Sequence, residues 1–175
     1  EMGTGAVGSY LALLIGVGGA LGIYMGGRLA DSLARLWGPQ WLPWVIAIAS
    51  IFTIPMLYLA FIAETASAAI WAYAIPAALG TVYVAPGFAL IQNETPLHMR
   101  SVAAAINLFI VNIIGLGLGP FTVGFLSDQF VTAHGVDSLR YALMSTLVII
   151  VWSIFHYYRA GVLLRRRASD SVATA

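Results

Sequence analysis

The sequence predicts an all-α integral membrane protein with five transmembrane helices, and three observations carry this prediction. The 175 residues are 61% hydrophobic and only 9% charged, with a mean hydropathy of +0.91, whereas a soluble domain carries about 25% charged residues. The apolar residues fall into five runs, each near the roughly 20 residues that cross a bilayer as a helix. Two of these runs end on similar glycine-containing motifs that lie 97 residues apart.

The five runs follow one another with short polar connections. We interpret the chain as a piece of a longer polypeptide, because it begins at Glu1 and is apolar within a few residues. A complete small membrane protein is the alternative. The predicted spans are residues 7–30, 41–63, 66–91, 101–126 and 139–163, which form one bundle, residues 1–164, followed by a tail, residues 165–175.

The arginines are distributed unevenly between the two sides of the membrane that five spans define. Arg140 falls on one side, and the other seven fall on the opposite side. Because positively charged loops remain in the cytoplasm, we expect the connection 31–40 and the carboxyl tail to be cytoplasmic. The seven arginines on that side are Arg28, Arg35, Arg100, Arg159, Arg165, Arg166 and Arg167.

The first and fourth spans carry small residues at helical spacing. Small residues on one face let helix backbones approach closely in lipid, so these spans are predicted to be packing helices. Generic packing would explain the spacing but not the similar ends, Gly27–Asp31 and Gly124–Asp128, which five spans place on opposite sides of the membrane. Such an inverted repeat is typical of transporters. The packing residues are Gly18, Gly22 and Gly26 in the first span and Gly115, Gly119 and Pro120 in the fourth.

The second and fifth spans have large apolar side chains around most of their circumference. A helix of this kind usually faces lipid. Trp41 and Trp44 begin the second span, and Tyr157 and Tyr158 lie near the end of the fifth. Their amphipathic rings suit the level of the lipid headgroups, so we interpret them as anchors.

The third span is the most polar of the five. Tyr73 and Tyr83 share one face, Thr81 lies nearby, and Pro76 and Pro86 interrupt the helix. A helix broken in this way typically bends or lines a cavity. We therefore name Tyr73, Thr81 and Tyr83 as candidate substrate contacts, with interfacial or simply packed tyrosines as the alternative.

Two carboxamides, Asn107 and Asn112, lie in the first half of the fourth span. A carboxamide in hydrocarbon needs hydrogen-bond partners, so each either joins helices or contacts a substrate. No aspartate, glutamate or arginine lies in the middle of any span. If transport is coupled to protons, the ionisable group at depth lies outside this piece.

Charged residues gather where the spans end. Asp31 ends a helix between two arginines, and its carboxylate would form a contact in one conformation and break it in another; simple interfacial charge is the alternative. Glu94 and Arg100 would pair across the turn that they flank. The candidate conformational residues are Gly27, Arg28, Asp31, Arg35, Glu94, Arg100 and Asp128.

The sequence offers little for catalysis. Cysteine is absent and the three histidines are isolated, so no metal cluster is expected. The glycine pattern at residues 3–8 has no preceding strand and is followed by an apolar span, which argues against nucleotide binding. We expect no enzyme activity, since a membrane enzyme would need a buried carboxylate, a histidine pair or a metal site. We also expect no cofactor and no nucleic-acid partner.

These motifs resemble the carboxyl-terminal half of a major facilitator superfamily transporter. The run Gly27–Arg35 resembles the cytoplasmic loop motif between the eighth and ninth helices, with Ser32 where a basic residue is usual. The resemblance to Spinster-like members is carried by Phe88–Asn93, Met99–Ala105, Asn112–Pro120, Leu126–Asp128 and Ser138–Ala142.

The resemblance implies that the five spans are helices eight to twelve of a twelve-helix fold with inverted repeats, in a bacterial inner membrane. It implies a secondary active transporter that moves a small organic solute or a lipid-like molecule by alternating access. The partners would be the bilayer, the small-molecule substrate and the amino-terminal half of the same polypeptide. A non-transporting scaffold or receptor-like protein is the alternative.

Overall fold

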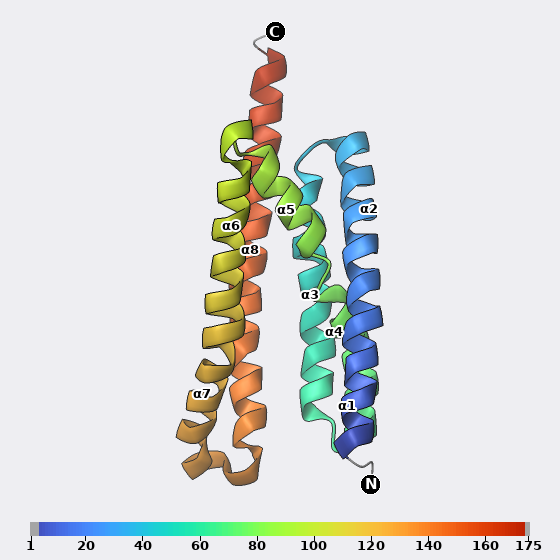
Figure 1. Ribbon diagram of the computed structural model, residues 1–175, viewed down its shortest axis with the longest axis vertical. Coiled ribbons are helices and arrows are strands. Elements are labelled where there is room, and N and C mark those ends of the chain that lie inside the picture. Colours follow the sequence, from blue (N-terminus) through green and yellow to red (C-terminus); the bar gives the residue numbers. More distant parts are fainter. Residues whose placement is uncertain (1–3, 174–175) are drawn as a thin grey trace. The chain divides into compact units, whose positions relative to one another are not determined.

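The computed structural model describes residues 4–173, and these residues are helical almost throughout (Figure 1). No strand occurs among them. The α-helices are α1 (Thr4–Leu13), α2 (Gly19–Trp37), α3 (Trp41–Ile62), α4 (Ala66–Leu79), α5 (Val84–Asn93), α6 (Arg100–Ile110), α7 (Gly119–His134) and α8 (Ser138–Ala173); η1 (Leu14–Gly18) and η3 (Val111–Leu118) are π-helical, and η2 (Leu97–Met99) and η4 (Gly135–Asp137) are 3₁₀ turns.

Four helical stretches in the described part of the chain are long and apolar enough to cross a membrane. The prediction of an all-α membrane protein is therefore confirmed at the level of its class. The stretches are Val7–Trp37, Trp41–Ile62, Ala66–Asn93 and Leu97–Asp170.

The last of these stretches reverses direction near its middle. The hydroxyls of Ser127 and Ser138 lie 3.2 Å apart, whereas eleven residues of straight helix would separate them by about 16 Å. The reversal occurs at Gly135, whose φ is +53°. The ring of His134 stacks on that of Tyr141, with their centroids 3.8 Å apart. The stretch thus consists of two helical segments joined by a tight turn.

The connection predicted at residues 31–40 is helical as far as Trp37. Leu33 and Ala34 pack against buried residues, so burial extends the helix beyond the apolar run. Gly38 ends α2 with a φ of +103°, and its amide donates to the carbonyl of Ala34 at 2.9 Å. The predicted tail is likewise helical, because α8 continues to Ala173.

The two copies of the repeat share backbone features as well as residues. Each passes from a π-helical segment into an α-helix, ends that helix before a glycine with positive φ, and begins the next helix three residues later. The equivalent positions, all 97 residues apart, are Leu14 and Val111 at the starts of η1 and η3, Trp37 and His134 at the ends of α2 and α7, Gly38 and Gly135 at the turns, and Trp41 and Ser138 at the starts of α3 and α8.

Contacts divide the chain into two units, and the first contains residues 4–90 and 150–173. Its core is small and lies where α2, α3 and the segment after α4 meet. Ala30, Leu42, Val45, Ala49 and Val82 form this buried cluster. The core therefore holds the middle of the third apolar stretch against the first two.

The second unit, residues 91–149, presents its apolar side chains outward. Phe109, Leu116 and Phe121 are about two-thirds exposed. Within this range the structure describes only Ser138 and Ala142 as buried. Large exposed apolar surfaces of this kind are covered by lipid or by other protein in a membrane.

Candidate functional site

The third apolar stretch is interrupted at residues 80–83, between α4 and α5. Pro76 and Pro86 flank the interruption, and each removes one backbone donor from the helical ladder. The chain compensates with tighter bonds, as when the amide of Val84 donates to the carbonyl of Thr81 at 3.1 Å. The interruption predicted from the two prolines is present.

Two glycines of α2 face this interruption without side chains. A Cβ on Gly22 would overlap the carbonyl group of Ala78, with the carbonyl carbon 2.9 Å away. A Cβ on Gly26 would lie 2.7 Å from the carbonyl oxygen of Val82. Both glycines are buried. Glycine at these two positions therefore lets α2 contact the backbone of the neighbouring segment directly.

Thr81 joins the same two segments through its hydroxyl. The hydroxyl lies 2.9 Å from two carbonyl oxygens, one of Gly19 in α2 and one of Ala78 in its own segment. Thr81 and Tyr73 are half-buried, and Tyr83 is 40% exposed. The structure thus assigns Thr81 a packing contact, while its role toward a substrate stays a prediction, as it does for both tyrosines.

A cavity of about 460 Å³ lies beside this crossing, between α2, α3 and α4. Glycines and apolar side chains line it, including those of Met25, Phe52 and Val82. Neither tyrosine nor Thr81 is among its lining residues. The cavity in this part of the first unit would therefore receive an apolar group rather than a hydrogen-bonding one.

The two asparagines lie on the second unit, around the start of η3. The amide of Asn112 donates to the carbonyl of Leu108 at 2.7 Å, which is a contact within its own helix. Asn107 is half-buried, and its backbone carbonyl accepts from the amide of Val111. Asn112 is exposed, so the oxygen of its carboxamide can accept a hydrogen bond from a neighbouring group.

The charged motif at the end of the first stretch makes contacts within α2. The guanidinium of Arg28 donates to the hydroxyl of Tyr24 at 3.1 Å and lies over its ring. Arg35 donates to the backbone carbonyl of Asp31 at 3.2 Å. Asp31 is exposed, and across residues 4–173 its carboxylate takes part in no ion pair. A Cβ on Gly27 would lie 3.0 Å from that of Ala85.

The turn between α5 and α6 is held by side-chain contacts to its backbone. Arg100 donates to the carbonyl of Thr95 at 3.3 Å, and the Thr95 hydroxyl donates to the carbonyl of Ile91 at 2.6 Å. Arg100 thus contacts Thr95, the residue next to Glu94 in the sequence, and the pairing of Arg100 with Glu94 itself stays a prediction. Asp128, the counterpart of Asp31 in the second copy, is exposed.

The predicted packing residues of the second copy are in a different environment from those of the first. Gly115 has nothing within 4 Å of its Cβ position, and Gly119 has only a backbone oxygen of its own turn at 4.0 Å. Pro120 is exposed at the start of α7. Within the described chain this small-residue face is therefore open.

One contact was not predicted from the sequence, although two of its residues, Trp44 and Tyr158, are predicted to be interfacial anchors. The indole nitrogen of Trp44 donates to the carbonyl of Tyr158 at 3.3 Å, and the two rings stack with their centroids 6.4 Å apart. Gly161, the one glycine of the predicted fifth span, is buried under Trp44. The isolated glycine was the available signal, but one sequence does not indicate what packs on it.

Long apolar helices, glycine-mediated crossings and an interrupted helix define a helical membrane protein. No group of histidine, aspartate or glutamate side chains in the described residues could hold a metal ion. The chain is 37% identical over 143 residues to an MFS-type efflux pump of Mycolicibacterium smegmatis. This match is to a protein of the major facilitator superfamily, the superfamily that the motifs of this chain resemble.

The alignment covers 82% of this chain but 33% of the efflux pump, so the chain spans about a third of the length of the relative that it matches. No family model matches the sequence. No solved structure matches it either.

Proposed function

We propose that the chain forms five helices, eight to twelve, of a major facilitator transporter that works by alternating access. The observation that carries the proposal is the repeat at a spacing of 97 residues, in which helix ends, positive-φ glycines and π-helical segments recur together. The similarity to an efflux pump supports the same conclusion from independent information. Repeats of this kind build the two-sided architecture of carriers.

Five spans are supported by the turn at Gly135, which divides the fourth apolar stretch into two segments. The contact between Trp44 and Tyr158 also supports this count, because it joins the start of α3 to the second half of α8. Five alternating spans put these two places on the same side of the membrane. On this basis the connection 31–40 and the end of α8 are cytoplasmic, in a bacterial inner membrane.

The interrupted helix α4–α5 would line the transport path. Within the first unit, Tyr73 and Tyr83 would offer hydroxyls and the 460 Å³ cavity would receive an apolar part of the solute, while a substrate contact by Asn107 and Asn112 stays a prediction from the sequence. The substrate class is therefore a small organic or lipid-like molecule with both apolar and hydrogen-bonding surfaces. Because the relative is named an efflux pump, we extend the direction of export to this protein.

Asp31 would form an ionic contact at the cytoplasmic face in one conformation of the protein only, and we call this contact the ionic latch. Its carboxylate is exposed and has no ionic partner in residues 4–173, so it is available to a donor on another part of the full-length protein. Contact in one conformation and release in the other would set the balance between inward-open and outward-open states.

Export from cells tests the proposal. Cells that produce the full-length protein would be loaded with fluorescent organic dyes, both cationic and neutral, and with short-chain fluorescent phospholipids, and then energised. We expect faster loss of at least one compound than from cells without the protein. Equal loss of every compound, with the protein verified in the membrane, would favour a scaffold or receptor instead.

A further inference from the structure

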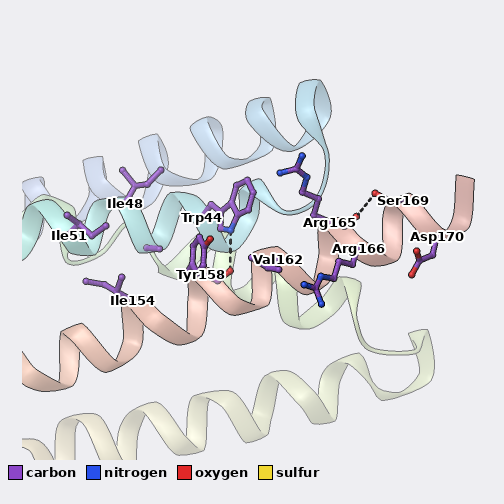
Figure 2. A pocket seen from close by; sticks show the side chains of 11 residues that line it. Trp44, Ile48, Ile51, Ile154, Tyr158, Val162, Arg165, Arg166, Ser169 and Asp170 are labelled. Carbon is purple, nitrogen blue, oxygen red and sulfur yellow. Dashed lines mark hydrogen bonds between the residues drawn. The ribbon is translucent and has the colours of Figure 1, made fainter.

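A groove of about 620 Å³ runs between α3 and α8 in the first unit, apart from the proposed transport path (Figure 2). One end is apolar and is lined by Ile48 and Ile51 of α3 and Ile154 of α8. The other end is polar and is lined by two arginines, a serine and an aspartate of α8. The groove therefore has the same division into an apolar and a charged end as a phospholipid.

Trp44 and Tyr158 form the wall between the two ends. Their stacked rings and the hydrogen bond from the Trp44 indole to the Tyr158 carbonyl fix the wall in place, as Figure 2 shows. Gly161 allows the tryptophan to lie against α8, because a Cβ there would overlap the indole ring. Tryptophan and tyrosine concentrate at the level of lipid headgroups, so this wall marks the depth at which the apolar end begins.

The polar end carries net positive charge. Arg165 and Arg166 line it together with Asp170, which gives two guanidinium groups against one carboxylate. Both arginines are exposed, and no ion pair holds either guanidinium within residues 4–173. The planar fork of a guanidinium matches the oxygens of a phosphate in a bidentate geometry, so this end suits a phosphate group.

The length of the groove fits one leaflet of the membrane. Its lining on α8 extends from Ile154 to Asp170, and sixteen residues of helix rise about 24 Å. A bilayer with its headgroups is about 40–45 Å thick, so one leaflet is about 20–22 Å. Other residues of α3 belong to the core, but Ile48 and Ile51, which line the groove, are exposed, so this face of α3 is open to a lipid.

We propose that this groove binds an anionic glycerophospholipid of the cytoplasmic leaflet. The phosphate would lie at the polar end, where the guanidinium of Arg165 or of Arg166 would bind it, and one acyl chain would extend past Tyr158 along Ile154 and Ile51. A lipid without net charge would gain the apolar contacts but less from the arginines. The groove should therefore prefer an anionic headgroup, and the preference should depend on these two arginines.

Lipid retention by the purified full-length protein tests the proposal. Native mass spectrometry would be recorded in detergent with equal amounts of dioleoyl phosphatidylglycerol and dioleoyl phosphatidylcholine. We expect tighter retention of phosphatidylglycerol. Each basic residue near a membrane surface contributes about fivefold to the binding of an anionic lipid. The double variant R165Q/R166Q should thus weaken the binding of phosphatidylglycerol at least tenfold. It should also remove the preference of the protein for phosphatidylglycerol over phosphatidylcholine.

Matched variants separate the charge from the apolar end. Arg167→Gln removes the same charge one residue further on, outside the groove lining, and should change retention less than twofold. Ile154→Trp should fill the apolar end of the groove and weaken the retention of both lipids. Val151→Trp lies on α8 but outside the groove lining, so it should not change the retention of either lipid.

Three results would overturn the proposal. The first is equal retention of phosphatidylglycerol by the wild-type protein and R165Q/R166Q. The second is displacement of the lipid by inorganic phosphate at the same concentration with no effect of Ile154→Trp, because the site would then bind phosphate alone. The third is a dimer whose dissociation is needed before lipid is retained, because a second copy would then occupy the groove.

Discussion

Gly22 determines how closely α2 approaches the interrupted segment, because any side chain there would meet the backbone carbonyl of Ala78. Gly16 lies on the same helical run and has nothing within 4 Å of its Cβ position. The two residues therefore form a matched pair. Both are glycines in one predicted span, and only one of them is needed for a helix contact.

We expect Gly22→Ala to lower the melting temperature of the full-length protein by several degrees. Overpacking typically costs about 1–3 kcal/mol, and a backbone carbonyl cannot move aside as a side chain can. Gly16→Ala should leave the melting temperature unchanged or raise it, since alanine favours helix over glycine. Equal melting temperatures for the two variants, measured by tryptophan fluorescence, would show that the crossing does not contribute.

Thr81 presents a choice between two roles, packing and substrate contact. Its hydroxyl lies within hydrogen-bond distance of the Gly19 carbonyl on α2. Thr81→Val removes the hydroxyl at nearly constant shape and should cost about 1 kcal/mol of stability. Thr81→Ser keeps the hydroxyl and should therefore keep this stability. If Thr81→Val instead kept full stability and raised KM for export, the hydroxyl would be a substrate contact.

Asp31 should matter for transport more than for folding. We expect Asp31→Asn to reduce the export rate at least severalfold at unchanged expression and melting temperature, because the neutral side chain cannot form the ionic latch. Asp137→Asn is the matched control. It also removes one exposed carboxylate, from a surface pair with Arg140 at 3.4 Å that is worth at most about 1 kcal/mol. Equal export by both variants would remove Asp31 from the mechanism.

At the residue scale, the sequence predicts which side chains are exceptional but not which ones meet. The fourfold glycine spacing indicates a close contact in the first span, yet the same pattern in the fourth span faces nothing within the described chain. Trp44 is predicted to be an interfacial anchor, but the sequence does not indicate that Gly161, 117 positions further on, packs against it. Periodicity reports one helix at a time, so contacts between distant helices require the fold.

At the element scale, apolar length predicts the spans better than charge predicts their ends. The predicted second span, 41–63, closely matches α3, because the start at Trp41 and the polar Glu64–Thr65 connection coincide with real breaks. The hydroxyl of Thr65 caps α4 by accepting from the amide of Ala68 at 3.2 Å. Helix α2 and helix α8 instead continue into charged sequence, because arginine and leucine favour helix whether or not lipid surrounds them.

Gly38 and Gly135 end equivalent helices with backbone angles that favour glycine. Their φ values are +103° and +53°, and a side chain in such a conformation costs about 1–3 kcal/mol. We expect Gly38→Ala and Gly135→Ala each to lower the melting temperature. Gly124→Ala, in the middle of α7 with nothing within 4 Å of its Cβ position, should not. Similar melting temperatures for all three variants would contradict the turn geometry at both positions.

At the scale of the whole molecule, the central claim is that the two copies of the repeat cross the membrane in opposite directions. An odd number of spans from one copy to the next produces this inversion, so the claim depends on two places in the chain, the interruption at residues 80–83 and the turn between α5 and α6. The interruption must lie inside one span, and the turn must separate two.

Cysteine accessibility measures this inversion directly, since the chain has no cysteine of its own. Leu36 and Ala133 occupy equivalent positions, 97 residues apart, and both are exposed. Leu36→Cys and Ala133→Cys would be introduced singly into the full-length protein, freed of any other cysteine, and treated in intact cells with a membrane-impermeant maleimide. We predict labelling at residue 133 in intact cells and at residue 36 only after the membrane is opened. Labelling of both residues from the same side would contradict the inverted repeat and, with it, the assignment of this chain to five helices of a carrier.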